Sequence, residues 1–239
     1  MRALFDPEVE FENNEAVIGP PHVHHLHNVI RIQPGEKLLL IDGRGKQTIT
    51  EVIASSKKEI ALKKIEELFF QDQRQVDLLL APPKKDTFHE ILKISVELDI
   101  KSIYLADTHY SQRFPYKKEK IEKIVQGAYE QSNSAFEIEI IESNSLLNMK
   151  PLLESYDHVL YFSTMSDNEG ESKLWEPLLS EKILVVVGPE GGFSSDEHQF
   201  FLALDKVHEI RLQTNILRSQ TAVSAALGYV HGKLLLPRS

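Results

Sequence analysis

A glycine-rich loop that follows a buried strand is the part of this sequence whose residue types could do chemistry. The β-branched run Val185–Val187 ends in Gly-Pro-Glu-Gly-Gly at positions 188–192. This pattern predicts a strand that opens into a loop at its carboxyl end, where open α/β sheets bind ligands. The loop fits neither the dinucleotide fingerprint nor the Walker loop, and the carboxylate of Glu190 would repel a pyrophosphate. An adenosine, an ammonium or a sulfonium is compatible with it, and so is a tight turn that binds nothing.

A second motif lies downstream, where residues 215–222 read Asn-Ile-Leu-Arg-Ser-Gln-Thr-Ala. The two motifs in this order resemble those of the RsmE-type 16S ribosomal RNA uridine-N3 methyltransferases of the SPOUT superfamily. Weaker matches extend the resemblance over nearly the whole chain, at His25–Arg31, Pro34–Glu36, Ile41–Gly43, Lys84–Asp86, Ser95–Leu98 and Glu130–Ser132. The chain departs from the family pattern at Gln213, Gln220 and Asn133-Ser134, where the family has glycine, glutamate and arginine.

The resemblance implies an α/β protein with a SPOUT domain that carries a C-terminal deep trefoil knot, preceded by a small PUA-like β-barrel domain. Residues 1–70 would form the barrel that docks RNA, and residues 75–239 the knotted domain that binds the cofactor and dimerises. The implied cofactor is S-adenosylmethionine, and the implied partners are 16S ribosomal RNA within the small ribosomal subunit and a second copy of the chain.

The same resemblance assigns the candidate site residues. Those expected to bind the cofactor are Phe162, Ser163, Gly188, Pro189, Glu190, Gly191, Gly192, Leu212, Ile216 and Leu217. Arg218 is the first catalytic candidate, since its guanidinium could stabilise negative charge on the uracil carbonyls. Glu190 is the second, as a general base. An ion pair between these two residues that locks their loops together is an equally good interpretation for Arg218 and the favoured one for Glu190. The RNA-binding candidates are Arg2, His25, Arg31, Arg44, Lys84 and Lys85, each of which could also be an ordinary surface charge.

Composition limits the chemistry. The chain has 239 residues, a net charge of −9 and no cysteine. Methylation of a pyrimidine carbon commonly uses a thiolate adduct, so a nitrogen atom is the compatible target. The negative charge requires that any RNA contact be a local basic patch. With no signal peptide or apolar run long enough to span a bilayer, we expect a cytoplasmic protein without membrane contact.

Four histidines between His22 and His27 could suggest a metal site. Without cysteine or a well-spaced carboxylate, we expect no metal there and interpret the segment as a polar loop that leads into a strand.

Periodicity and turn residues predict the elements. In the first domain we expect strands over Lys37–Ile41, Gln47–Ala54 and Glu59–Ile65, with a hairpin turn at Asp42-Gly43, and a polar boundary over Glu66–Gln75. In the second we expect strands over Val76–Ala81, Ser102–Leu105, Glu137–Ile141, His158–Ser163, Ile183–Val187 and Val207–Leu212. Helices should begin at Thr87 and near Ser195, each with a capping box, and should span Tyr116–Tyr129, Ser145–Ser155 and Thr221–Leu234. Such alternation predicts a mainly parallel sheet covered on both faces.

Three other functions remain open: a non-catalytic RNA-binding ribosome-assembly relative, a SPOUT methyltransferase that acts on another RNA site, and a metabolic α/β enzyme unrelated to RNA. Binding of the methyl donor discriminates the first, and the N-terminal match argues against the second. The double motif disfavours the third.

Overall fold

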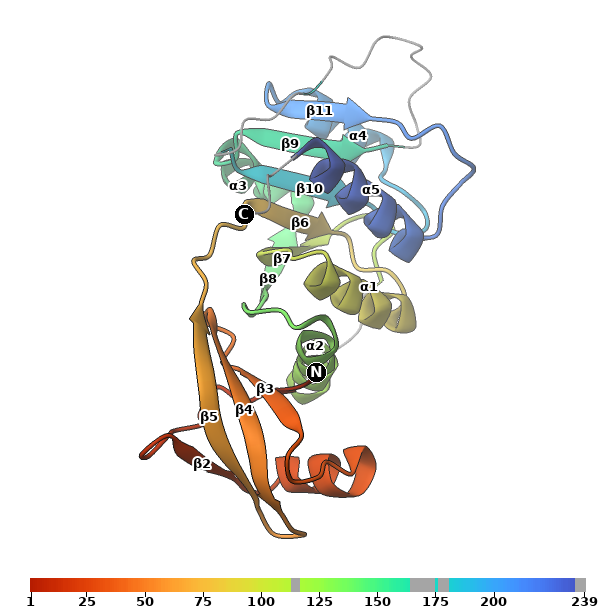
Figure 1. Ribbon diagram of the computed structural model, residues 1–239. Helices are drawn as coiled ribbons and strands as arrows, with labels where there is room; N and C mark the ends of the chain where they lie inside the picture. The colour runs from red at the N-terminus through yellow and green to blue at the C-terminus, as the bar shows by residue number, and fades with distance from the viewer. Residues whose placement is uncertain (113–116, 164–174, 176–180, 235–239) are drawn as a thin grey trace. The chain divides into compact units, whose positions relative to one another are not determined.

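The structure is a computed structural model that describes residues 1–112, 117–163, 175 and 181–234. The chain divides into two compact units (Figure 1). The first contains Met1–Gln73 and Val125–Glu137, and the second contains Arg74–Ile124 and Ile138–Ser239.

Five strands form the sheet of the first unit, in the order β1-β3-β4-β5-β2. They are β1 (Arg2–Phe5), β2 (Glu15–Ile18), β3 (Lys37–Ile41), β4 (Lys46–Ser55) and β5 (Ile60–Phe69). β1 runs parallel to β3, and the other neighbours are antiparallel. The predicted turn joins β3 to β4, where Gly43 and Gly45 have φ values of 74° and 100°. These values favour glycine, since a Cβ atom is strained there.

Both faces of this sheet are covered. One face packs Leu38 and Leu40 of β3 against Leu26 of the π-helix η1 (His24–Ile30). On the other face, Leu39 and Ile41 form a small separate core. The alternation explains why β3 reads as a continuous apolar run, since a strand buried on both faces has no polar side.

Residues 125–137 complete the first unit. The rings of Phe5 and Tyr129 lie 5.0 Å apart, and the backbone N–H of Phe5 donates to Glu130 Oε1 over 3.1 Å. Gln47 Nε2 donates to the carbonyl of Asn133 over 2.9 Å, and Asn133 itself has a left-handed φ of 55°. This segment belongs to helix α2 (Lys118–Ser132) and the turn after it.

The second unit contains a six-stranded sheet in the order β11-β9-β10-β6-β7-β8, in which every neighbouring pair is parallel. Its strands are β6 (Val76–Leu80), β7 (Ser102–Asp107), β8 (Glu139–Ser145), β9 (His158–Phe162), β10 (Ile183–Val187) and β11 (Val207–Ile210). Because the strands are parallel, all their carboxyl ends lie at one edge of the sheet.

Helices cover both faces of this sheet (Figure 1). On one face α1 (Lys85–Glu97) packs against α5 (Ser219–Lys233), which also contacts β10. On the other are the 3₁₀ turn η2 (Leu146–Asn148) and the helices α3 (Lys150–Glu154) and α4 (Ser195–Leu202). The predicted α/β class with a parallel sheet is confirmed. None of the described helices is long and apolar enough to cross a membrane.

Several predicted elements are confirmed with small shifts of their ends. β3 and β10 match their predicted ranges, and β4, β6, β7, β9, β11 and α5 agree within three residues at each end. α4 begins as predicted, because Ser194 Oγ accepts from the Glu197 N–H and the Glu197 carboxylate accepts from the Ser194 N–H. The predicted helix start at Tyr116 lies outside the described residues, and α2 is helical from Lys118.

Other predictions are wrong. The helix expected from Thr87 begins two residues earlier at Lys85, and Glu90 pairs with Lys93 instead of closing a capping box. The single helix expected over Ser145–Ser155 is interrupted, since η2 and α3 are separate and the Pro151 ring cannot donate a hydrogen bond.

Three more elements differ from the prediction in their length or in their type. The histidine segment forms η1 instead of a polar loop, because Leu26 is needed in the core. β5 continues to Phe69, into the segment expected to be a polar boundary, since its backbone pairs with β4 as far as Lys46. β8 begins two residues later than expected and ends at Ser145.

Candidate functional site

The end of β9 and the loops after β10 and β11 line a cavity of about 280 Å³ at the carboxyl edge of the second unit's sheet. The pairing register brings the ends of these three strands to the same level. Phe162 pairs with both Val187 and Ile210, and the Ser163 N–H donates to the Ile210 carbonyl over 3.0 Å. The three strand ends therefore lie side by side at the edge where open α/β sheets bind their ligands.

The loop after β10 is a tight turn built on glycine. The Gly192 N–H donates to the Pro189 carbonyl over 2.9 Å, and Gly192 has a φ of 71°. A methyl group on Gly188 would lie 2.9 Å from Cε2 of the buried Phe193 ring. Gly188 is thus required because the Phe193 ring packs against its Cα, and Gly192 because its φ lies in the left-handed region.

The loop after β11 contributes apolar surface to the cavity. Ile216 is 90% exposed and lines the cavity together with Leu212 and Leu217. An aliphatic side chain left in water beside a cavity offers surface that a ligand can cover, at about 25 cal/mol for each Å² buried.

A buried carboxylate holds two loops at this edge. Glu197 is 7% exposed, and its Oε2 accepts from the Ser194 N–H while its Oε1 accepts from the His109 N–H, each over 2.8 Å. Ser194 follows the loop after β10, and His109 belongs to the loop after β7. Glu197 therefore fixes the position of the first loop relative to the second.

Aromatic rings form the floor of the cavity on the β9 side. The Tyr161 ring stacks on Phe201 at 4.5 Å and meets the Phe193 ring edge-on at 5.4 Å. Its hydroxyl is hydrogen-bonded to His198 Nδ1 at 3.0 Å. Burial raises the pKa of Tyr161 to about 12, so this floor stays neutral at physiological pH.

The structure brings together all the residues predicted to bind the cofactor. Each of them lines this one cavity: Phe162, Ser163, Gly188, Pro189, Glu190, Gly191, Gly192, Leu212, Ile216 and Leu217. Sequence reasoning missed further lining residues, namely Tyr161, Val187, Phe193, Ile210, Arg211, Thr214, Asn215, Ser219 and Ala222. These residues could have been predicted from the sequence, because they lie inside or beside the same two motifs or at the ends of the predicted strands.

Of the two catalytic candidates, Glu190 lines the cavity and is exposed at the turn. Arg218 is the N-cap residue of α5, lies between two lining residues and has an exposed side chain. Both belong to the described part of the chain, in which no ion pair joins them. The locking ion pair considered from the sequence is therefore not formed.

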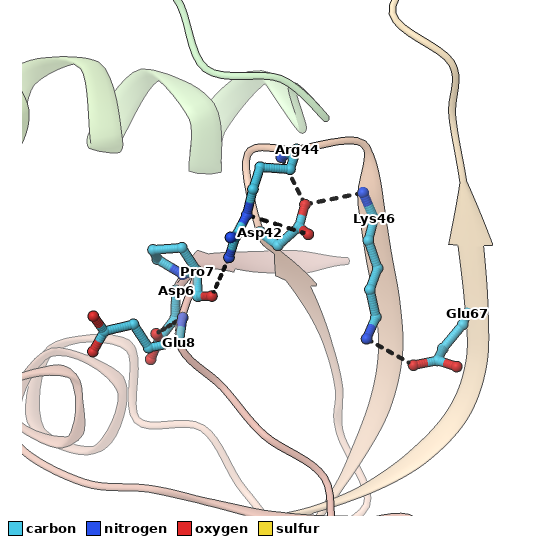
Figure 2. Close-up of polar contacts among 7 residues, drawn as sticks. All are labelled: Asp6, Pro7, Glu8, Asp42, Arg44, Lys46 and Glu67. Carbon is cyan, nitrogen blue, oxygen red and sulfur yellow. Dashed lines mark hydrogen bonds and ion pairs between the residues drawn. The ribbon is translucent and has the colours of Figure 1, made fainter.

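Two of the RNA-binding candidates are tied to their own chain. Arg2 Nη1 donates to the Ile30 carbonyl over 3.0 Å. Arg44 Nη2 donates to the Pro7 carbonyl over 2.7 Å, and Asp42 accepts from the Arg44 and Lys46 N–H groups at the turn (Figure 2).

The turn in Figure 2 also carries its own counter-charges. Lys46 Nζ lies 3.0 Å from Glu67 Oε1. Lys64 Nζ approaches the same oxygen to 3.3 Å. The hydrogen bond from Lys46 and the nearby Lys64 lower the pKa of Glu67. Arg44 thus lies in a turn where Asp42 is its own counter-ion and Lys46 is paired with Glu67 of β5.

The remaining RNA-binding candidates are exposed. His25 lies in η1, Arg31 ends that helix with a φ of 58°, and Lys84 and Lys85 stand at the amino end of α1. The first two belong to the first unit and the lysines to the second.

The histidines of the η1 region have separate partners. His22 Nε2 lies 3.5 Å from Asp6 Oδ2, and His27 Nδ1 lies 3.0 Å from Ser55 Oγ. Within the described ranges, no group of three or more histidine, aspartate and glutamate side chains is arranged to hold a metal ion.

A second cavity, of about 380 Å³, lies at the amino ends of β9 and β11, where Val159 and Val207 line it. Its Lys206 is engaged, since Nζ donates to the Glu154 and Tyr156 carbonyls over 2.9 and 2.7 Å. Ligands of open α/β sheets bind at the opposite, carboxyl edge, so the glycine-loop cavity is the candidate site.

Known proteins resemble the chain over most of its length. Ribosomal RNA small subunit methyltransferase E of Rickettsia conorii is 26% identical over 212 residues, covering 87% of this chain and 86% of the relative. Its namesake from Bacillus subtilis is 24% identical over 224 residues, with the same coverage. The crystal structure of the Neisseria gonorrhoeae enzyme of that name, bound to S-adenosyl methionine, matches with a TM-score of 0.76 at 23% identity and covers 97% of each chain.

Family models agree with the division into two parts. Residues 19–65 match the RNA methyltransferase PUA domain, and residues 71–231 match the RNA methyltransferase domain. The second match covers more than half of the sequence and includes the whole glycine-loop cavity. The resemblance to the RsmE-type enzymes drawn from the motifs is confirmed, and the chain belongs to the RNA methyltransferase domain family.

Proposed function

We propose that this protein uses S-adenosylmethionine to methylate N3 of a uridine in 16S ribosomal RNA of the small ribosomal subunit. The observation that carries the proposal is the glycine-loop cavity at the carboxyl ends of β9, β10 and β11, in a chain of the RNA methyltransferase family. The named activity of relatives with about one quarter identical residues supports the substrate. The proposal includes a closed PUA-like barrel in residues 1–70, a deep trefoil knot in residues 75–239, a homodimer and a cytoplasmic location.

The chemistry of the cavity fits S-adenosylmethionine. Gly188 and Gly192 line the cavity without side chains, and Ile216 and Leu217 offer aliphatic surface to an adenine ring. The exposed carboxylate of Glu190 suits a ligand that carries sulfonium and ammonium charges. The bound cofactor would supply an electrophilic methyl group, and these residues would hold and orient it.

The reaction requires little covalent help from the protein. N3 of uracil is weakly acidic, so the chain must take the base out of pairing, favour its anion and hold N3 in line with the methyl group. Arg218 is the residue assigned to the developing charge on the uracil carbonyls, since its guanidinium is exposed beside the cavity and forms no ion pair with Glu190. Glu190 is the remaining candidate for accepting the N3 proton. The chain contains no cysteine, which agrees with attack by a ring nitrogen.

We assign RNA docking to the exposed His25 and Arg31 of the first unit and to Lys84 and Lys85 of the second. Arg2 and Arg44 are oriented by carbonyls of their own chain.

Transfer of labelled methyl groups tests the proposal. Small ribosomal subunits from cells that lack this protein are incubated with the purified protein and S-adenosylmethionine, and the modified nucleoside is mapped by mass spectrometry. N3-methyluridine at a single site is the expected product. Binding of the cofactor without transfer to subunits would favour another RNA as substrate, and failure to bind the cofactor would favour the non-catalytic RNA-binding relative.

Arg218→Ala separates binding from chemistry. We expect the turnover number to fall by about 10²- to 10³-fold, the effect of removing one donor from a developing anion, while the dissociation constant of S-adenosylmethionine stays within about threefold, a difference of under 1 kcal/mol. Lys93→Ala is the matched control, because Lys93 is an exposed cation on α1 paired with Glu90. Wild-type turnover by Arg218→Ala would remove this arginine from the mechanism.

A further inference from the structure

The loop after β7 is a rigid turn at the same edge of the sheet as the glycine-loop cavity. The Thr108 N–H donates to Ser111 Oγ over 3.0 Å, and the Ser111 hydroxyl donates to the Thr108 carbonyl over 3.0 Å. Glu197 accepts from the His109 N–H, and the Gln112 N–H donates to the Pro82 carbonyl over 2.8 Å. The turn is therefore held at its start, across its middle and at its end.

This turn presents an aromatic ring to solvent beside the cofactor loop. Tyr110 is 47% exposed, although its ring is large and apolar. A methyl group added to Gly191 would lie 3.0 Å from both Cβ and Cγ of Tyr110, so the tyrosine packs directly against the loop that lines the cavity. The His109 ring meets the Tyr110 ring edge-on, with centroids 4.5 Å apart and an interplanar angle of 89°. Tyr110 is thus supported by Gly191 and His109, while nearly half of its surface stays exposed.

We propose that Tyr110 is the stacking platform for the target nucleobase, which it holds next to the methyl donor. The inference rests on the proposed function and adds a residue that touches the RNA. Its occupant is a single unpaired pyrimidine taken out of the RNA stack.

Three observations favour a nucleobase over other occupants. Every nucleobase has a flat π-face, and stacking on an aromatic side chain is a general way to bind unpaired bases. The platform adjoins Gly191, so a base stacked there lies beside the cavity assigned to the methyl donor. The turn is also bonded to Pro82, close in sequence to the exposed Lys84 and Lys85, whose charges complement the phosphates of the flanking nucleotides.

Rigidity matters for this role. A platform that changed position would lose the alignment of N3 with the methyl carbon, and misplacement by 1 Å can cost about 10²-fold in rate. The hydrogen bonds of Thr108, His109 and Gln112 fix the backbone on both sides of Tyr110, so that only its side-chain torsions remain to be ordered.

The test compares three variants by methyl transfer to unmethylated small subunits and by calorimetric binding of S-adenosylmethionine. Tyr110→Ala should lower kcat/KM for subunits about tenfold or more, the loss expected for one stacked base, with unchanged cofactor affinity. Tyr110→Phe should keep kcat/KM within about threefold of wild type, because the ring and not the hydroxyl does the stacking. Leu202→Ala is the control, since Leu202 is 45% exposed and ends α4, away from the cavity, and it should behave as wild type.

Other results would overturn the platform. Wild-type kinetics of Tyr110→Ala would show that no base uses the ring. Equal losses in Tyr110→Ala and Tyr110→Phe would assign the effect to the hydroxyl, and a matching loss of cofactor affinity in Tyr110→Ala would make the tyrosine a mere support for Gly191. Absence of transfer by the wild-type protein itself would overturn the proposed function and the platform with it, whereas normal wild-type transfer with an unaffected Tyr110→Ala would overturn the platform alone.

Discussion

Replacing Glu197 by alanine should destabilise the second unit and loosen two loops at once. The carboxylate is 7% exposed and accepts two backbone N–H groups over 2.8 Å, one from Ser194 and one from His109. Among the described residues, these two N–H groups have no other acceptor. In Glu197→Ala both donors lose their partner within the protein.

The expected loss follows from these two bonds. A hydrogen bond to a charged group contributes about 1.5–3 kcal/mol, so that two of them set an upper range of about 3–6 kcal/mol. Water that enters the space left by the side chain can satisfy part of the lost bonding, and the variant no longer has to bury a carboxylate. We therefore expect the free energy of unfolding to fall by about 3 kcal/mol.

Urea denaturation followed by tryptophan fluorescence measures this change. The sequence contains one tryptophan, Trp175, which is 3% exposed and packs against His158 of β9, so its signal reports on the unit that contains Glu197. With a urea m-value of about 2–3 kcal/mol/M, a loss of 3 kcal/mol moves the midpoint by about 1–1.5 M.

A matched control is Glu90→Ala. Its carboxylate is exposed and makes one ion pair to Lys93 at 2.9 Å, so we expect a change of less than about 0.5 kcal/mol. If Glu197→Ala unfolds at the same urea concentration as the wild type, the two loops are held by something other than this carboxylate, and the reasoning fails.

Two further predictions concern stability. Burial raises the pKa of Tyr161 to about 12, and burial together with a hydrogen bond to a carboxylate raises the pKa of Tyr156. Each folded pKa exceeds the unfolded value near 10, so the stabilisation from each tyrosine is complete below pH 10. Above pH 10 the free energy of unfolding falls by about 1.4 kcal/mol per pH unit for each tyrosine, up to its folded pKa. Urea curves at pH 9 and 11 should therefore show a smaller loss of stability in Tyr161→Phe than in the wild type. Gly45→Ala should cost more than about 2 kcal/mol, because φ is 100° and the new methyl would lie 2.6 Å from a backbone oxygen. Gly127→Ala, in an exposed and open helical position, should stabilise by about 0.5–1 kcal/mol, and equal effects of the two glycine variants in thermal unfolding would contradict this contrast.

Buried strands were the elements that the sequence predicted best. β10 matches its predicted range because all five of its residues are buried, and a β-branched run bounded by a Gly-Pro turn leaves few alternatives. β1 and β2 were not predicted. Each has only four residues, too few for a clear pattern. β2 alternates exposed with buried positions, whereas β1 has two adjacent buried residues and is specified by its parallel pairing to β3, which is distant in sequence.

The first residue of a helix was harder to predict from the sequence than the helix itself. At α4 the predicted capping box forms because Ser194 precedes the helix and Glu197 can turn back to it. At α1 the same pattern of residues lies within the helix, since Lys84 takes the N-cap position with no side-chain hydrogen bond. A local motif cannot distinguish these cases, because the path of the preceding chain decides where the first helical turn begins.

The cavity could be located from the sequence because its lining residues come from motifs at three strand ends. Tyr110 could not be found in this way, since it belongs to no motif. The residues around it have the polar composition of an ordinary surface loop. Its significance depends on its contact with Gly191, which is 81 positions later in the sequence. The two residues meet because β7 and β10 lie in the same sheet, with only β6 between them. The departure at Asn133 has a local explanation, because its φ of 55° suits asparagine better than arginine.

The net charge of −9 constrains how such a protein recognises RNA. A uniformly basic surface binds any phosphate backbone, whereas an acidic one is repelled except where cations are concentrated. Lys84 and Lys85 stand at the amino end of α1, where the helix dipole adds to their positive charge. The carboxyl edge of the second unit therefore combines cations, an exposed ring and the glycine-loop cavity, while the acidic remainder disfavours binding elsewhere along the RNA. Selectivity for one nucleotide in a large ribosomal RNA would then arise from repulsion over most of the surface as much as from attraction at this edge.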